Sequence, residues 1–420
     1  MVIKKIKSAN GEVTVPGDKS ISHRAVMLSS LADGTSTIKG FLMGADCLST
    51  IDCFRSMGID IQVMPDEVIV HGNGMRGLKK PAKQLYTGNS GTTTRLLCGI
   101  LSAQDFDVSM TGDESIQKRP MKRVTQPLSQ MGAKIDGEYC PLTIHGTHLS
   151  GMDYKMNVAS AQVKTAVILA GLYAEGETVI HECEKSRDHT ERMLSAMGAN
   201  INVDGLTITV KPTDSLKAMD FIVPGDISSA AFFMVLGAVM PSSCITIKNV
   251  GINETRTGII DVLYDMGADM SIDNTRIVNG EEVADITVKT SQLRGTVIGD
   301  DVIPRLIDEL PVIAAAAVFA EGETVIKDAA ELKVKETNRI RAVVDEFLKC
   351  GIDITETDDG MIIRGGKAIH GADFKTYGDH RMAMTLTVLA QLAEGESTID
   401  DEKCIDVSYP TFFEDFYNLG

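Results

Sequence analysis

One pattern, a helix end followed by a glycine turn and a short β-branched strand, recurs along the whole chain. The residues AEGETVI occur at 174–180 and again at 320–326, and AEGEST follows at 393–398. A second pattern joins a helix ending in MG or CG to a strand, and it starts at positions 56, 130, 196, 265 and 349. Gly favours the C-terminal end of a helix, and Thr, Val and Ile favour a strand. The chain is therefore predicted to consist of repeated α/β units.

The apolar helices of these units are expected to begin near Ser20, Gly91, Ser160, Ser228, Glu309 and His380. Their spacings of 68 to 81 residues divide the chain into six units, each with a helix, a strand, a helix and one or two further strands. Helices such as AAFFMVLGAVM (230–240) are apolar on all sides and should be buried, whereas the helices ending in MGA carry charges and should face water. Three units per globular half is the natural partition, with a boundary near residue 225.

Composition limits the function classes. A chain of 420 residues with 43% hydrophobic residues is expected to form about two to three domains with substantial cores. No apolar run approaches the roughly 18 residues that a membrane-spanning helix needs, so no membrane partner is predicted. The N-terminal residues MVIKKIKSANGEV contain no export signal, which predicts a cytoplasmic location. A net charge of −17 argues against nucleic acid as a partner.

Neither a metal site nor a cofactor is predicted. The eight cysteines form no CxxC pair and are interpreted as scattered reduced thiols. His145 and His148 form an HxxH pattern, but an ordinary loop is the preferred interpretation because no further ligand lies near in sequence.

The starts of the six apolar helices are rich in Gly, Ser and cations. The segments are PGDKSISHR (16–24), GNSGTTTR (88–95), ASAQVK (159–164), GDISSA (225–230), IDELP (307–311) and GDHRMAM (378–384). A helix start presents free N–H groups and a positive dipole end, which attract anions. Each single segment is also explained by ordinary N-capping. Together with Lys19, Arg24, Arg95, Lys164 and Arg381, however, they predict a cleft built for a polyanion.

Other interpretations of these segments are weaker. PGDKS is not a P-loop, because Asp18 stands where Gly is needed before Lys19. No Rossmann GxGxxG and no GxSxG is present, and Ser20 with His23 makes a poor nucleophile pair without an orienting acid. The charged segments ELKVKETNRIR (331–341) and EKSRDHTER (184–192) are interpreted, taken alone, as solvated helix starts, with Glu336 paired to Arg339.

Seven motifs in one order closely resemble the 5-enolpyruvylshikimate-3-phosphate (EPSP) synthase family, the 3-phosphoshikimate 1-carboxyvinyltransferases. They are PGDKSISHR, GNSGTTTR, KRPM (118–121), SAQVK, PRLIDELP (304–311), VKETNR (334–339) and GDHRMAM. The resemblance runs from about residue 12 to about residue 413. It implies an α/β (α+β) fold, a two-domain inside-out α/β barrel of six βαβαββ repeats, three per domain, with helix N-termini facing an interdomain cleft.

The resemblance also implies that the chain crosses between the domains twice, which the repeats alone do not reveal. Residues 1–19 and 226–420 would form one domain, and residues 20–225 the other, with hinges near 19–20 and 225–226. The first domain would contribute the phosphoenolpyruvate site and Glu336, and the second most of the shikimate 3-phosphate site.

In this family the enolpyruvyl group of phosphoenolpyruvate is transferred to the 5-hydroxyl of shikimate 3-phosphate, and phosphate is released. The resemblance implies binding of shikimate 3-phosphate by Lys19, Ser20, Arg24, Ser160, Ala161, Gln162, Arg187, Asp308 and Lys335. It implies binding of phosphoenolpyruvate by Lys19, Asn89, Gly91, Arg119, Gln162, Arg339 and Arg381. Arginine suits these places because its planar fork binds carboxylate or phosphate through two hydrogen bonds.

The same resemblance implies the catalytic groups. Asp308 would act as base on the 5-hydroxyl and Glu336 as proton donor to the methylene carbon, with Lys19 and His380 assisting. No metal is expected, because Lys and Arg would neutralise the substrate charge. The protein is expected to act as a monomer.

Some positions fit a glyphosate-tolerant second class of the family. The sensitive class has a Lys near the C-terminus where this chain has Val407. Arg187 in RDHTE, Gln162 in SAQVK and the segment NETR (253–256) fit the tolerant class, whereas Gly91 is Ala in some tolerant members.

Two alternatives stay open. A sister family transfers the same group to UDP-N-acetylglucosamine, but it has Lys-Asn where Lys19-Ser20 stand and uses a cysteine acid, which is absent beside Arg119. A non-catalytic anion-binding protein on the same fold would not need Asp308, Glu336 and His380.

Overall fold

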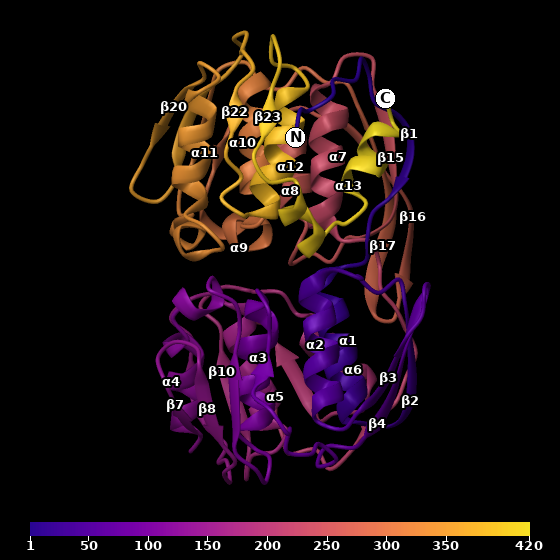
Figure 1. Ribbon diagram of the computed structural model, residues 1–420, viewed down its shortest axis with the longest axis vertical. Helices are drawn as coiled ribbons and strands as arrows, with labels where there is room; N and C mark the ends of the chain where they lie inside the picture. The colour runs from indigo at the N-terminus through magenta and orange to yellow at the C-terminus, as the bar shows by residue number, and fades with distance from the viewer. The chain divides into compact units, whose positions relative to one another are not determined.

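The computed structural model describes all 420 residues and divides them into two compact units (Figure 1). Unit 1 comprises Met1–Pro16, Pro224–Ile277 and Glu282–Gly420, and unit 2 comprises Gly17–Val223 and Val278–Glu281. The main boundaries lie at residues 16/17 and 223/224, two to three residues before the expected hinges. The short segment Val278–Glu281, at the tip of a hairpin, was not expected in unit 2.

Unit 2 contains three repeats, each with its own sheet. The first contains α1 (Lys19–Leu31), β2 (Ala32–Lys39), α2 (Ala45–Ser56), β3 (Asp60–Val63) and β4 (Glu67–Asn73). The second contains β5 (Leu85–Tyr86), α3 (Gly91–Leu101), β6 (Val108–Thr111), the 3-10 helix η1 (Ile116–Lys118), α4 (Lys122–Gln130), β7 (Lys134–Asp136) and β8 (Leu142–His145). The third contains β9 (Asp153–Lys155), α5 (Ala161–Gly171), β10 (Thr178–His181), α6 (His189–Ala196), β11 (Ile201–Asp204) and β12 (Thr207–Val210).

A parallel pair and an antiparallel hairpin form each sheet of unit 2. The strand orders are β5-β6-β8-β7 and β11-β12-β10-β9 in the second and third repeats. In the first repeat the parallel partners of β2 come from the far end of the unit, as β13 (Leu216–Lys217) and β14 (Phe221–Ile222). The last residues of unit 2 therefore complete the sheet of its first repeat.

Unit 1 follows the same plan in its first two repeats. The fourth repeat of the chain contains β1 (Asn10–Thr14), α7 (Ile227–Val239), β15 (Cys244–Gly251), α8 (Gly258–Asp265), β16 (Asp269–Val278) and β17 (Glu281–Lys289). The fifth contains β18 (Val297–Ile298), η2 (Asp300–Val302), α9 (Ile303–Leu306), α10 (Leu310–Phe319), β19 (Glu323–Ile326), η3 (Ala330–Val334), α11 (Arg339–Leu348), β20 (Asp353–Glu356) and β21 (Met361–Arg364). Because β1 pairs in parallel with β15, the N-terminal segment completes the fourth repeat.

The sixth repeat is shorter than the expected βαβαββ unit. It contains β22 (Asp373–Phe374), α12 (His380–Ala390), β23 (Thr398–Ile399), η4 (Lys403–Val407) and α13 (Phe412–Tyr417), and its sheet has two strands. The final hairpin is absent because TFFEDFY places aromatic rings at helical spacing, and Phe412 lies 6.0 Å from both Phe232 and Phe233 of α7 between ring centroids. An aromatic helix replaces the hairpin here.

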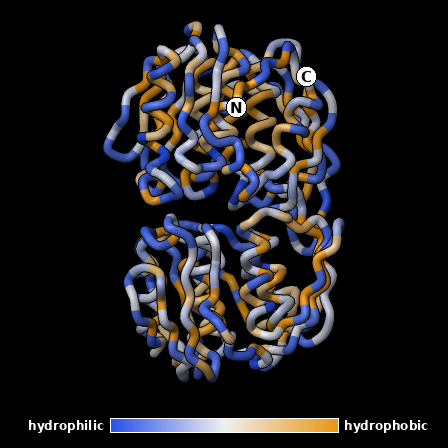
Figure 2. Tube along the Cα trace, viewed as in Figure 1, coloured by the Kyte–Doolittle hydropathy of each residue, from blue (hydrophilic) through white to orange (hydrophobic).

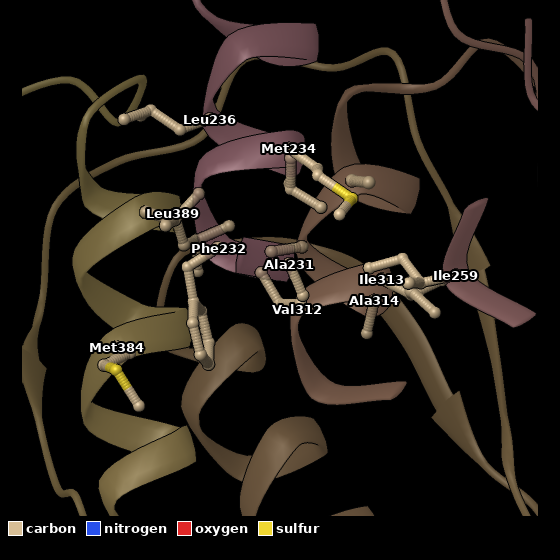
Figure 3. Packing of buried hydrophobic residues seen from close by; sticks show 14 of the residues in the cluster. Ala231, Phe232, Met234, Leu236, Ile259, Val312, Ile313, Ala314, Met384 and Leu389 are labelled. Atoms are coloured by element: carbon tan, nitrogen blue, oxygen red, sulfur yellow. The ribbon is translucent and has the colours of Figure 1, made fainter. Parts of the chain in front are cut away.

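The predicted starts of the six apolar helices are confirmed to within one residue, at Lys19, Gly91, Ala161, Ile227, Leu310 and His380. Within unit 1, α7, α10 and α12 pack against one another, and the trace in Figure 2 is orange or pale along much of them. Figure 3 shows Phe232 of α7 and Val312 of α10 in this core. The run Ala314–Ala317 is fully buried, and its small side chains allow close helix approach. None of the helices combines the length and apolar character that a bilayer crossing needs.

The aromatic cluster of unit 1 generates a stability prediction. Phe233 is fully buried, with ring centroids 6.1 Å from Tyr409 and 6.4 Å from Phe416. We expect Phe233→Ala to lower the free energy of unfolding by about 3–5 kcal/mol, because a cavity replaces the ring. Urea unfolding followed by far-UV circular dichroism measures this change. The exposed Ile277→Ala serves as control, with an expected change within about 0.5 kcal/mol, and equal effects of both variants would contradict the prediction.

Candidate active site

The starts of the buried helices are capped by side chains, as the simpler interpretation expected. Ser90, Ser160 and Asp379 accept hydrogen bonds from backbone N–H groups of α3, α5 and α12. The exception is α10, where Glu309 makes no such bond and Pro311 occupies the first turn. A cap uses only one of the free N–H groups of a helix start, so capping leaves the others available to an anion.

In unit 2, the structure brings together Asn89, Gly91, Arg95, Arg119 and Gln162. The Arg119 guanidinium donates to Asn89 Oδ1 over 2.9 Å and to Ser115 Oγ over 3.0 Å. Arg95 donates to Gln162 Oε1, and Gln162 Nε2 donates to Thr92 Oγ1 over 3.0 Å. Two arginines and the start of α3 therefore share one cluster, which we call the Gly91 cluster.

Gly91 leaves little room for a side chain in this cluster. A Cβ atom at this position would lie 3.0 Å from Arg95 Nη1 and 3.3 Å from Arg119 Nη1. Both neighbours are the far ends of flexible side chains, so a methyl group would displace the guanidinium groups and leave the backbone in place. The absence of a side chain keeps two cations close to the helix N-terminus.

At the start of α1, Lys19 and Arg24 are held by polar partners. Lys19 forms an ion pair with Asp46, and its side chain is 20% exposed. Arg24 is buried, with Nε donating to Thr190 Oγ1 over 2.7 Å and Nη2 donating to Thr165 Oγ1 over 3.0 Å. Arg24 Nη1 also donates to the carbonyl of Ser20 over 3.0 Å, so this guanidinium is oriented by three elements.

The remaining expected residues of unit 2 lie at or near the start of α5. Ser160 is its N-cap residue, Ala161 and Gln162 occupy its first turn, and all three are partly exposed. Arg187 is partly exposed on the segment between β10 and α6.

Lys164 does not belong with the cations predicted to line a cleft, and that prediction is wrong. Its side chain is fully buried, with Nζ 2.6 Å from Glu191 Oε1 and 3.1 Å from Glu182 Oε1. The position lies one turn inside α5, where it points into the unit, and helix-start spacing alone did not distinguish this direction. The segment 184–192 is consequently not a solvated helix start, because His189 and Glu191 are buried.

His23 and His145, which the sequence offered as possible site residues, are held by structural contacts. His23 bonds through Nδ1 to Thr50 Oγ1 over 2.7 Å, so it does not activate Ser20. Burial, with Lys19 and Arg24 nearby, lowers the pKa of His23 well below its ordinary value. His145 lies at the end of β8, with its ring nitrogens 3.0 Å from Asp136 and 3.2 Å from Asp107. No group of three or more His, Cys, Asp or Glu side chains is arranged to hold a metal ion.

In unit 1, Arg339 joins the two predicted acid–base residues. Its side chain is 1% exposed, and Nη2 donates to Glu336 Oε2 over 2.6 Å while Nη1 donates to Asp308 Oδ1 over 3.3 Å. Asp308 also accepts from Lys335 Nζ over 3.1 Å. The predicted pairing of Glu336 with Arg339 is therefore confirmed, but the interpretation of this segment as a solvated helix start is wrong because Arg339 is buried.

Asp379 completes the surroundings of Arg339, and sequence reasoning did not single it out. Its carboxylate is fully buried and accepts from Arg339 Nε over 2.8 Å and from the backbone N–H of Arg381 over 2.9 Å. Burial alone would lower the pKa of Arg339, but the charges of Asp379, Glu336 and Asp308 raise it above its ordinary value. The sequence signal that points to Asp379 is the Asp directly before the helix in GDHRM, but ordinary N-capping also explains an Asp at this place.

A second buried network of unit 1 lies at the start of α7. Arg256 donates to Asp226 Oδ1 over 3.0 Å and to Ser228 Oγ over 2.8 Å, and Ser228 donates to Glu309. Arg381 Nη1 lies 3.9 Å from Glu309 Oε1. The segment NETR thus ends in a structural arginine, and Glu309 is a further functional candidate that sequence reasoning missed.

Two expected positions remain in unit 1. His380 opens α12 directly after Asp379 and is 4% exposed. Val407, which stands where the sensitive class has Lys, ends η4 and is partly exposed.

The fold, the Gly91 cluster and the carboxylates around Arg339 define an α/β repeat protein with cations suited to anions and carboxyl groups suited to acid–base chemistry. A family model described as EPSP synthase (3-phosphoshikimate 1-carboxyvinyltransferase) matches residues 3–416. The chain belongs to the EPSP synthase family.

Relatives of similar length support this assignment. A protein of Geobacillus kaustophilus named 3-phosphoshikimate 1-carboxyvinyltransferase is 56% identical over 420 residues, covering 99% of this chain and 98% of that protein. A protein of the same name from Bacillus pumilus is 55% identical over 419 residues, with the same coverage. The structure of EPSP synthase from Acinetobacter baumannii matches with a TM-score of 0.89 and 45% identity, covering 100% of this chain and 97% of that one.

The buried contacts of Asp379 generate a second stability prediction. We expect Asp379→Ala to lower the free energy of unfolding by about 3 kcal/mol, because it removes a buried partner of Arg339 and the cap of α12. Urea unfolding measures the change. Asp345→Ala removes an exposed carboxylate paired with Arg341 over 3.0 Å, and it should cost less than about 1 kcal/mol. A loss at Asp379 no larger than at Asp345 would show that the buried contacts contribute little.

Proposed function

We propose that the protein transfers the enolpyruvyl group of phosphoenolpyruvate to the 5-hydroxyl of shikimate 3-phosphate, giving 5-enolpyruvylshikimate 3-phosphate and phosphate. The observation that carries this proposal is the direct contact of Arg339 with both Glu336 and Asp308. The two carboxyl groups that would act as proton donor and base then share one cation, as suits an addition–elimination reaction between two anions.

The residues of unit 2 have the chemistry to hold the anionic groups. Lys19, Arg24, Arg187 and the start of α5 would bind the phosphate and hydroxyls of shikimate 3-phosphate, and the ordered Arg24 guanidinium supports this role. The Gly91 cluster would bind phosphoenolpyruvate through Arg119 and the N–H groups of α3. In unit 1, Arg381 would hold the same substrate, with Glu309 restraining it.

The proposed reaction has two steps. First, Asp308 accepts the proton of the 5-hydroxyl as this oxygen bonds to C2 of phosphoenolpyruvate, and Glu336 donates a proton to C3. The product of this step is a tetrahedral intermediate. Second, C3 returns a proton to Glu336 as the C2–O bond to phosphate breaks, which restores the double bond, and the proton held by Asp308 leaves with the phosphate. Lys335 and Arg339 lie against Asp308 and would stabilise its charged form before proton transfer. His380 and Lys19 would stabilise the charges that develop during these two steps.

Glu336→Gln tests this mechanism. The variant keeps the shape of the side chain but has no proton to donate, so turnover should fall by about 10² to 10⁴ while shikimate 3-phosphate still binds. Phosphate release is measured with both substrates together and with each alone, in the presence of EDTA.

Glu323→Gln is the matched control, because the exposed Glu323 side chain also pairs with an arginine, with Oε2 2.8 Å from Arg364 Nη2. Its turnover should equal that of the unmodified protein. If Glu336→Gln keeps normal turnover, Glu336 is not the proton donor. If the unmodified protein releases phosphate only when UDP-N-acetylglucosamine replaces shikimate 3-phosphate, the acceptor proposed here is wrong.

We also propose that the protein is a glyphosate-tolerant member of its family. Arg187, Gln162 and Val407 support this assignment from the sequence. Gly91 stands against it in part, because some tolerant members have Ala at this position. Inhibition of phosphate release by glyphosate should therefore be weak, and a micromolar inhibition constant competitive with phosphoenolpyruvate would overturn the assignment.

A cytoplasmic location and a monomeric state complete the proposal. The monomeric state rests on the family resemblance, and the location carries over the expectation from the sequence.

A further inference from the structure

A buried lysine in unit 2 is not used by the reaction proposed above. Lys164 lies on α5, one turn after its N-cap residue Ser160. Its ammonium group is fully buried and lies 2.6 Å from Glu191 Oε1 on α6 and 3.1 Å from Glu182 Oε1 after β10. Burying a charge is costly unless it is paired, so these contacts constrain the positions of all three segments.

The same group of residues holds the segment that carries Arg187. Lys164 Nζ donates to the carbonyl of Ser186 over 3.2 Å. Glu182 accepts from the backbone N–H of Ser186 over 3.0 Å and from its hydroxyl. Both backbone groups of the residue before Arg187 are therefore bound to the ion pair. The ammonium and the carboxylate together close the segment 182–186 into a fixed turn.

A second row of contacts joins the same two helices beside the ion pair. Thr165 and Thr190 are hydrogen-bonded over 2.8 Å, and both accept from the Arg24 guanidinium. Each of these threonines directly adjoins a member of the ion pair, since Thr165 follows Lys164 and Thr190 precedes Glu191. The position of Arg24 therefore depends on the α5–α6 contact that Lys164 stabilises.

We propose that Lys164 is a positioning residue for shikimate 3-phosphate, which fixes the start of α5, the Arg187 segment and the threonine pair that orients Arg24. This inference rests on the proposed function, because it names the substrate whose binding groups are held. Lys164 itself is too deeply buried to touch that substrate. Its effect passes through Ser160–Gln162, Arg187 and Arg24.

The carboxylates around Lys164 depend on its positive charge. Burial raises the pKa of Glu191, and the charge of Lys164 opposes this rise. One oxygen of Glu191, Oε2, is buried without a hydrogen-bond partner. Removing Lys164 alone would therefore leave two buried carboxylates without their cation, and the test must separate this loss of stability from the loss of positioning.

The test uses two variants of the full-length protein. Lys164→Met removes only the cation. The triple variant Lys164→Met, Glu182→Gln, Glu191→Gln removes all three charges, so it avoids buried unpaired charge and keeps the protein folded if the single variant does not fold. The KM for each substrate is measured by phosphate release, and amide hydrogen exchange is followed over residues 182–188. Leu169→Ala, in the buried face of the same helix, is the control for lost packing.

In the folded variants, the KM for shikimate 3-phosphate should rise by about tenfold to a hundredfold, the range that removal of a supporting partner causes at metal sites. The KM for phosphoenolpyruvate should rise less, by about threefold at most, because Gln162 is the one residue of the Gly91 cluster on α5, whereas Arg119 and Arg339 have other partners. Exchange over 182–188 should be faster. Leu169→Ala should lower the melting temperature and leave both KM values unchanged.

Each other outcome counts against the proposal in its own way. If the unmodified protein is active and the variants keep its KM for shikimate 3-phosphate, Lys164 has only a structural role. The same conclusion follows if both KM values rise equally, or if exchange over 182–188 is unchanged. If the unmodified protein releases no phosphate from the two substrates, the proposed function fails, and with it the substrate assigned to Lys164.

Discussion

The candidate active site of unit 1 depends on one buried charge, the guanidinium of Arg339. A group that is 1% exposed must have its charge compensated, and Asp308, Glu336 and Asp379 provide this through four hydrogen bonds. Asp379 is simultaneously the cap of α12, so the same carboxylate fixes the start of the helix that carries His380 and Arg381. The residues proposed as acid and base and two further candidate residues are therefore positioned by a single electrostatic requirement.

The repeat architecture makes such arrangements possible. The charged side chains of the six buried helices lie in their first two turns, close to the capping side chains and free N–H groups of the helix starts. Short turns link each helix to the strand that follows it. Two of the six sheets also pair with segments from a distant part of the chain. The chemistry of the site thus follows from where the helices begin, while the sheets determine where the helices lie.

Much of this was predictable because the repeats leave strong local signals. The six helix starts were located to within one residue, since Gly, Ser and Asp caps adjoin long apolar runs. The sixth repeat was less predictable, because a helix of aromatic residues packs on α7 where a hairpin was expected, and only the packing partner distinguishes the two. Likewise, the pairing of Glu336 with Arg339 follows from helical spacing, but the contact with Asp379 joins residues 40 positions apart.

The sequence by itself determined the repeated units, the helix starts, the family and the residue types available for binding anions. The tertiary structure alone decided which of those cations are exposed and which are buried. Arg381 and Lys164 both stand near helix starts, yet Arg381 is partly exposed, whereas Lys164 is enclosed by Glu182 and Glu191. The reason is physical: local spacing sets the side of a helix on which a residue lies, but burial depends on the carboxylates that distant segments bring to it.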